Sequence, residues 1–326
     1  MPLILTEQDV RALLEMPAAI SAVEESLVRQ ATGDGWIHPR RRLALPERVL
    51  LNYMFAADQK GGWMGAKLYS VSRGVARFLV LLYRVDTGEL AALIEGDYLG
   101  QVRTGAASAV ATKYLARPEA RVLGIIGTGT QARTQLAAVS EVRPVETIRA
   151  FGRDRGRLDN YCREMSERLR RPVTPASSAQ EAVHGADILI TATNSMKPIV
   201  CGEWLAPGVH INAIGANFAQ KRELDSDAVE RAAIIAVDSI QQANIESGDL
   251  IQAFGDDNSR WQQVRELGEI VAGKRPGRKT PEQITLFKSN GIASWDLAVG
   301  AYVFERAVKE GRGRTISLND TQASAH

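Results

Sequence analysis

The segment Gly127-Thr-Gly129-Thr-Gln-Ala132 constrains the fold of this chain more than any other feature. It is a G-x-G-x-x-A motif that follows the apolar run Val122–Ile126 and precedes a second strand-like run, Thr147–Phe151, as in a βαβ unit. In such a unit the glycines allow a tight turn and close backbone approach, Ala132 lets the helix pack on the strand, and the helix N-terminus stabilises an anion. The segment therefore predicts a binding site for a dinucleotide pyrophosphate.

The alternation of strand and helix continues beyond this unit. Apolar runs at Asp187–Thr191, His210–Ile214 and Ala233–Val237 are separated by helical patterns. This rhythm is typical of a doubly wound parallel sheet with helices on both faces. We therefore predict an α/β fold in which residues 117–299 form a Rossmann dinucleotide-binding domain.

The N-terminal part of the chain has a different rhythm. A helical apolar stripe begins after Pro17 and ends at Gly33. Strand-like runs without intervening helices follow it, at Val49–Ala57, Trp63–Val71, Phe78–Val85 and Glu89–Ile94. They predict an antiparallel or mixed sheet in an α+β domain, followed by a small-residue helix over Gly105–Leu115. A last helix, Ser294–Gly311, could pack on either domain or across a dimer interface.

Composition narrows the possible partners and location. The sequence has 40 basic and 38 acidic side chains and a net charge of +2, which gives no field that would favour nucleic acid or an anionic membrane. Cys162 and Cys201 do not lie in a zinc or redox spacing, so no metal site is expected. Without a signal-like N-terminus or a long apolar run, the chain is predicted to be cytoplasmic. Residues 319–326 are expected to be a disordered tail.

The residues after the second Rossmann strand choose between the two nicotinamide cofactors. An acidic residue there binds the ribose hydroxyls of NAD, whereas an arginine accepts the 2′-phosphate of NADP. Gly152 stands where the carboxylate is expected, and Arg153 follows it. These residues favour NADP(H). Asp154 could still serve NAD(H) after a small shift, and Arg153 could simply belong to a solvated run with Arg155 and Arg157.

Residues outside the loop carry a resemblance to a known family. The sequence resembles the ornithine cyclodeaminase/mu-crystallin family, which also includes archaeal-type alanine dehydrogenases and ketimine or imine reductases. The matching stretches span most of the chain: Gly100 to Ala109 (G-Q-V-R-T-G-A-A-S-A), Gly127 to Ala132, Asn212 to Ala216, Arg222 to Asp225, Glu246 to Leu250 and Phe287 to Gly291.

The resemblance implies a two-domain homodimer. Residues 1–116 with 300–326 would form a substrate-binding and dimerisation domain beside the Rossmann domain. Arg103 looks like the residue that holds the substrate carboxylate, which suits a guanidinium fork. Lys67 matches the active-site lysine of the family.

A second arginine of the family precedes the first strands and also binds the carboxylate. Three candidates, Arg40, Arg41 and Arg42, run together here. Counting back from Pro46 favours Arg42.

For the cofactor, the resemblance points to residues on several loops. They are Thr130 and Gln131 beside the glycines, Thr193, Gly215, Ala216, Lys221 and Ser289. Each has a plainer interpretation, because Thr193 and Ser289 could be turn residues and Lys221 an exposed charge.

One position departs from the cyclodeaminase pattern. An aspartate that handles the amine or activates water is replaced by Asn217, which follows Gly215 and Ala216. An asparagine can hydrogen-bond an amine or imine but is a poor general base. Asn217 is therefore a candidate site residue that argues against redox-neutral cyclodeamination.

Together these features predict an NAD(P)H-dependent enzyme that reduces a C=N bond next to a carboxylate, or runs the reverse amino-acid oxidation. The substrate would be a small imino or amino acid, held by Arg103 and Arg42, with Lys67 as the proton donor. One alternative is an ornithine or lysine cyclodeaminase that uses bound NAD. Another is a non-catalytic, mu-crystallin-like protein that binds NADP and a ligand.

Overall fold

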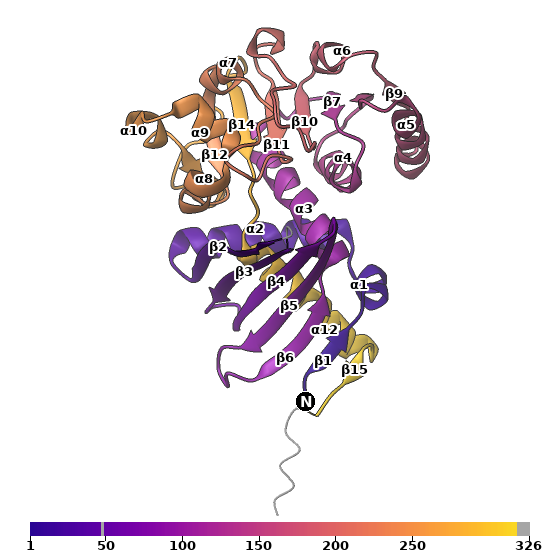
Figure 1. Ribbon diagram of the computed structural model, residues 1–326, viewed down its shortest axis with the longest axis vertical. Coiled ribbons are helices and arrows are strands. Elements are labelled where there is room, and N and C mark those ends of the chain that lie inside the picture. Colours follow the sequence, from indigo (N-terminus) through magenta and orange to yellow (C-terminus); the bar gives the residue numbers. More distant parts are fainter. Residues whose placement is uncertain (47–48, 318–326) are drawn as a thin grey trace, which may run out of the picture.

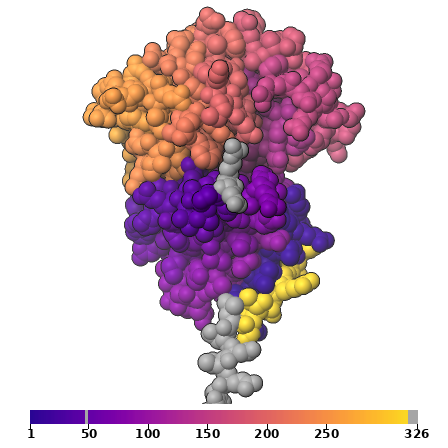
Figure 2. Space-filling model, viewed as in Figure 1, coloured from indigo at the N-terminus to yellow at the C-terminus, as the bar shows by residue number. Residues whose placement is uncertain are grey.

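The computed structural model describes residues 1–46 and 49–317. Two units, each built around one sheet, lie one above the other and are linked by the long helix α3, Asp97–Leu115 (Figure 1). The space-filling view shows the unit from the middle of the chain above the indigo N-terminal unit, with the yellow C-terminal strand beside the latter (Figure 2).

The N-terminal unit contains a seven-stranded sheet. Its order is β15 (Arg314–Thr315), β1 (Leu3–Leu5), β6 (Leu90–Glu95), β5 (Val75–Arg84), β4 (Trp63–Ser72), β3 (Val49–Asp58) and β2 (Gly35–Leu45). All neighbours are antiparallel except β1 and β6, so of the two predicted alternatives, an antiparallel or a mixed sheet, the sheet is mixed. Helices α1 (Glu7–Leu13), α2 (Met16–Thr32) and α12 (Ala293–Glu310) complete the unit, and α12 contacts β2 to β5.

The second unit is the predicted doubly wound fold. Its eight parallel strands run in the order β13 (Arg265–Glu266), β12 (Ala232–Val237), β14 (Ile284–Lys288), β11 (His210–Ala213), β10 (Ile188–Thr191), β7 (Val122–Ile126), β8 (Thr147–Phe151) and β9 (Val173–Pro175). From β7, the next strands along the chain, β8 and β9, are added on one side, and β10 and the later strands are added on the other side. The topological switch point therefore lies between β7 and β10. A crevice at the carboxyl ends of strands at such a switch point is where open α/β sheets bind ligands.

Helices connect these strands. They are α4 (Thr130–Val142), α5 (Arg155–Leu169), α6 (Ala179–Val183), α7 (Ser226–Glu230), α8 (Ile240–Glu246), α9 (Gly248–Phe254), α10 (Asn258–Trp261) and α11 (Leu267–Val271), with a 3₁₀ turn at Gly202–Trp204. None of the helices within residues 1–46 and 49–317 is long and apolar enough to span a membrane.

Helix α3 explains the run of small residues after Arg103. It is buried along most of its length and packs against α2, α4 and α12. At Gly105 a Cβ atom would lie 2.6 Å from the carbonyl oxygen of Thr134 on α4, so the two helices approach too closely for a side chain. The helix begins at Asp97, earlier than the predicted start at Gly105. The prediction started too late because it rested on the small residues, and the first turns of the helix carry site residues instead.

The structure differs from the sequence analysis at a domain boundary and at one strand. The predicted boundary at residue 300 falls inside α12, and the whole helix packs on the N-terminal sheet, so the Rossmann unit ends before Ala293. Strand β2 was not predicted either, because Pro39 and the three arginines after it hide the strand pattern. The expected tail at 319–326 lies outside the described residues.

Candidate active site

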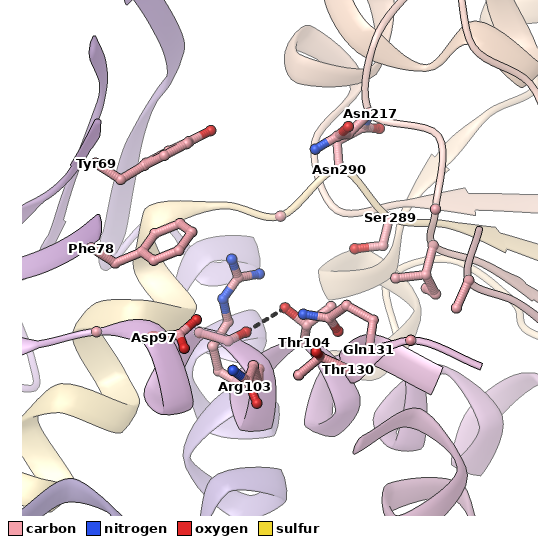
Figure 3. A pocket seen from close by; sticks show the side chains of 18 of the residues that line it. Tyr69, Phe78, Asp97, Arg103, Thr104, Thr130, Gln131, Asn217, Ser289 and Asn290 are labelled. Carbon is pink, nitrogen blue, oxygen red and sulfur yellow. Dashed lines mark hydrogen bonds between the residues drawn. The ribbon is translucent and has the colours of Figure 1, made fainter. Parts of the chain in front are cut away.

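A cavity of about 390 Å³ lies between the two units. One side is lined by β2, β4, β5 and the start of α3, and the other by the loops that follow β7, β10, β11 and β14. Figure 3 shows the guanidinium of Arg103 pointing into the middle of this space, with Phe78 on one side and Ser289 on the other. The cavity thus joins the predicted substrate residues to the predicted cofactor loops.

Lys67 and Arg103 meet at one buried carboxylate. Lys67 Nζ donates to Asp296 Oδ1 at 2.6 Å, and Arg103 Nε donates to the same oxygen at 3.1 Å. The three residues come from β4, α3 and α12 and are all buried. Gly100, one turn before Arg103 on α3, leaves room for the lysine, because a Cβ there would lie 3.0 Å from Nζ.

Burial and charge shift the protonation of this cluster. Burial lowers the pKa of Lys67 to about 8, in opposition to the attraction of Asp296. Burial alone would raise the pKa of Asp296, but the charges of Arg103 and Lys67 outweigh it and hold that pKa below its usual value. Lys67 is therefore a buried ammonium that can release its proton near neutral pH.

The cavity contains Arg40, not Arg42, which was the predicted choice. A β-bulge in β2 explains the difference: His38 pairs with Phe55 and Arg41 with Tyr53, so Pro39 and Arg40 together face one residue of β3. A bulge re-aims a side chain. Here it buries Arg40 in the cavity wall, a local irregularity that the sequence pattern does not reveal.

Arg42 instead connects the two units beside the cavity. Its guanidinium pairs with Glu246 on α8, donates to the carbonyl oxygen of Asn217 at 3.1 Å, and lies 4.0 Å from the ring centre of Phe218. Arg40 pairs with the same Glu246 and donates to the carbonyl oxygen of Asn290 at 2.9 Å.

Two aromatic rings form the wall of the cavity on the sheet side. Tyr69 and Phe78 are stacked, with ring centres 5.0 Å apart and planes 28° apart. Lys67 Nζ lies 5.2 Å from the centre of the Phe78 ring. Asn217 lines the opposite side, as Figure 3 shows. A flat ligand could thus lie between the aromatic wall and the cofactor loops.

The glycine loop has the geometry of a dinucleotide cradle. Gly127 has φ +120°, and a Cβ there would lie 2.4 Å from the carbonyl oxygen of Ala192, so only glycine fits. A Cβ on Gly129 would meet open space, and Gly129 caps α4 without a side-chain hydrogen bond. The first amides of α4 are therefore available to an anion. Ala132 is buried where α4 packs, as predicted.

A second hollow, of about 560 Å³, continues from this loop toward β8. Both hollows are lined by Gly129 and Thr193, so a ligand could run from one to the other across the glycine loop. The second hollow is lined further by Gly152, Arg153 and Arg157. Its extent fits a dinucleotide whose adenosine half lies beside β8.

The other predicted cofactor residues divide into two groups. Thr130, Gln131, Thr193, Gly215 and Ser289 line the first cavity, and the side-chain oxygen of Gln131 is buried with no partner among the described residues. Ala216 and Lys221 do not line this cavity: Ala216 is fully buried, and Lys221 Nζ lies 5.1 Å from the ring centre of Phe218.

Glu223 is a structural organiser that the sequence did not suggest. This buried carboxylate accepts hydrogen bonds from the Thr193 amide, the Thr193 hydroxyl and the Gly215 amide, each at 2.7 Å. It therefore holds together the loops that follow β10 and β11. Asp249 fixes Glu223 in turn by accepting from its backbone amide at 2.6 Å. Glu223 belongs to the stretch Arg222 to Asp225 that carries the family resemblance, but only the fold brings these loops together.

Comparisons with known proteins agree with this geometry. The model of the ornithine cyclodeaminase/mu-crystallin family matches residues 1–311. A Δ1-pyrroline-2-carboxylate reductase of Bacillus cereus is 40% identical over 241 residues, which are 74% of this chain and 74% of that protein.

Two solved structures are also similar. The Δ1-pyrroline-2-carboxylate reductase of Thermococcus litoralis, in complex with NADH and L-proline, superposes with a TM-score of 0.92 at 35% identity, over 96% of this chain and 100% of that one. An archaeal alanine dehydrogenase dimer with bound NAD gives a TM-score of 0.91 at 33% identity, over 98% and 99% of the two chains.

Proposed function

The chain belongs to the ornithine cyclodeaminase/mu-crystallin family, and on that premise we propose that it reduces a C=N bond next to a carboxylate with a nicotinamide dinucleotide. The substrate is a cyclic ketimine or an imine of a 2-oxo acid, and the reverse reaction oxidises the amino acid. The bound dinucleotide supplies the hydride.

The observation that carries this proposal is the position of three cations on the wall opposite the cofactor loops. Arg103 has a terminal nitrogen that is buried with no partner among the described residues, so a ligand carboxylate would satisfy it. Arg40 replaces Arg42 as the second carboxylate ligand, because Arg40 lines the cavity. Lys67, beside them, donates the proton to the imine nitrogen.

Asn217 separates this reaction from cyclodeamination. It lines the cavity where a lyase of this family would need a carboxylate. Because its amide cannot take up a proton at neutral pH, it supports hydrogen bonding to the imine or amine rather than base catalysis.

The experiment that tests the proposal follows NADPH and NADH oxidation by the purified protein. The substrates are Δ1-pyrroline-2-carboxylate, Δ1-piperideine-2-carboxylate, and pyruvate with ammonia or methylamine. Oxidation that depends on one of these imines supports the proposal. Ammonia release from ornithine or lysine without net change of the cofactor would favour the lyase instead.

Among the two dinucleotides, we propose that NADP(H) is preferred. Asp154 is occupied as the N-cap of α5, where it accepts from the amide of Arg157 at 2.9 Å. A Cβ on Gly152 would lie 2.7 Å from Thr128 Cγ2, so a carboxylate at this position would require Thr128 to move. Arg153 and Arg157 line the hollow and can bind a 2′-phosphate. Both similar structures contain NAD(H), so this preference would distinguish the chain from them.

Replacing Arg153 with alanine is expected to weaken NADPH binding by about tenfold or more while changing NADH binding little, since a charge-assisted hydrogen bond contributes roughly 1.5–3 kcal/mol. Fluorescence titration of both cofactors measures the effect. Arg155→Ala is the matched control, because this exposed side chain pairs with Asp159 outside the hollow. Equal NADPH affinity in wild type and Arg153→Ala would contradict the preference.

We further propose a homodimer that forms through the open face of the N-terminal sheet. Large apolar side chains are exposed at alternating positions of β2, β3 and β5 on this face: Trp36, Leu43, Leu45, Leu51, Tyr53, Phe55 and Leu79. Such a contiguous apolar surface marks an interface. A second copy is the partner that the symmetry of most soluble oligomers favours.

Phe55→Asp is expected to convert the dimer to a monomer, because it places a charge in the middle of this face. Light scattering coupled to size exclusion measures the mass. Met196→Asp changes an exposed apolar residue of the other unit and should leave the mass unchanged. A Phe55→Asp protein that still has the mass of two chains would exclude this face as the interface.

A further inference from the structure

A single oxygen of Asp296 receives two cationic groups of the active site. Lys67 Nζ is 2.6 Å and Arg103 Nε 3.1 Å from Oδ1, and the side chains of the three residues are 3%, 8% and 1% exposed. Asp296 lies in the first turn of α12, far along the chain from the two cations. It does not line the cavity, so it acts on the ligand only through them.

We propose that Asp296 is a positioning residue that keeps Lys67 protonated and aims Arg103 at the substrate carboxylate. The inference rests on the proposed function, which gives Lys67 and Arg103 their roles.

Asp296 orients Arg103 because it binds one particular nitrogen of the guanidinium. Asp296 takes Nε, while the terminal nitrogen Nη1 is buried without a partner among the described residues. That end of the guanidinium lies beside Gly291, where a Cβ would be 2.7 Å from Nη1. Figure 3 shows it directed into the cavity. The pairing therefore orients the side chain and leaves its terminal edge free for a ligand.

The effect on Lys67 follows from the charges around it. Burial, which disfavours the charged form, is the main cause that lowers its pKa, and the positive charges of Arg103 from α3 and Arg40 from β2 lower it further. Among the described residues, Asp296 is the carboxylate that hydrogen-bonds Lys67. The other polar or aromatic groups on the surrounding elements are Asp97 at the start of α3, Tyr69 on β4, Phe78 on β5, and Glu246, which pairs with Arg40.

Removing the charge of Asp296 should therefore deprotonate Lys67 at neutral pH. With the carboxylate present, the pKa of Lys67 is about 8. An opposite charge at this distance accounts for roughly one to three pKa units, so Asp296→Asn should move the pKa of Lys67 from about 8 to neutrality or below. Lys67 loses its proton as the pH rises through its pKa, so proton donation should then fail at lower pH.

The activity test compares pH profiles of kcat for reduction of Δ1-pyrroline-2-carboxylate. We expect the alkaline limb of Asp296→Asn to move to lower pH by at least about one unit, with a loss of about fivefold or more at pH 8 and a smaller loss at pH 6. Ser294→Ala, on the same turn of α12, is the matched control and should keep the wild-type profile. A purely structural role would lower kcat equally at every pH, and that result would overturn the proposal.

A second measurement does not depend on turnover. Nitrogen-15 NMR of labelled lysine side chains gives the pKa of Lys67 directly, and Lys67→Gln identifies its signal. An unchanged pKa in Asp296→Asn would overturn the proposal, even if the wild-type protein reduced no imine and the proposed function failed. If Asp296→Asn did not fold, Arg103→Gln would serve: loss of the second cation beside Lys67 should raise its pKa, and an unchanged pKa would mean that the charges around Asp296 do not control the protonation of Lys67, which would overturn the proposal.

Discussion

Replacing Lys67 with glutamine is expected to lower kcat for imine reduction by about 10²–10⁴-fold, the usual contribution of a positioned acid or base. The glutamine amide can still occupy the space beside Gly100 and hydrogen-bond Asp296, but it has no proton to give. Dinucleotide affinity should stay unchanged, because Lys67 lies on the sheet side of the cavity, away from the glycine loop. Steady-state kinetics with saturating cofactor measures the effect.

Lys113→Gln is the control for this experiment. Lys113 is an exposed lysine on α3 that pairs with Glu24, remote from the cavity lining. It should keep wild-type kcat. If Lys67→Gln retained more than about a tenth of wild-type kcat, well outside the range for a positioned acid, another group would have to be the proton donor.

Replacing Arg103 with lysine should lower kcat/KM by about 10²–10³-fold, within the roughly 2–5 kcal/mol that follows loss of one partner in a buried charge pair. A lysine is charged but lacks the fork that could contact Asp296 through one nitrogen and a ligand carboxylate through others. The loss should appear mainly in KM for the imine, because the missing interaction is made with the bound substrate as well as with the transition state.

Arg306→Lys is the corresponding control, since Arg306 pairs with Glu310 on the surface of α12. A substrate lacking the carboxylate gives a second check. Wild type should reduce such an imine poorly, and Arg103→Lys should lose nothing further with it. An equal loss on both substrates would mean that Arg103 has a structural role and does not bind the carboxylate.

Local patterns predicted the parts of this protein that depend on neighbours in sequence. Gly127 and Gly129 belong to a strand–turn–helix segment, so their role follows from a short stretch of chain. The alternation of strands and helices gave the doubly wound sheet, and the structure confirms it. Lys67 and Arg103 came from the resemblance, and the structure brings both to one cavity.

The residues that sequence reasoning missed depend on distant contacts or on a local irregularity. Asp296 is 193 positions from Arg103, and Glu223 is 30 positions from Thr193, so no short pattern connects them. Arg40 was passed over for Arg42 because the bulge in β2 interrupts the alternation that a sequence pattern assumes. The end of the Rossmann unit was misplaced because α12 is apolar on one face whichever sheet it covers.

The central claim, hydride transfer to a C=N carbon next to a carboxylate, is tested most directly by isotope transfer. A single turnover with Δ1-pyrroline-2-carboxylate and NADPH that carries deuterium at both hydrogen positions of the nicotinamide C4, analysed by mass spectrometry and NMR, follows the hydride itself. We expect proline that carries one deuterium at Cα, with none at the other carbons. Proline without deuterium, or no consumption of any imine while ornithine releases ammonia, would contradict the account.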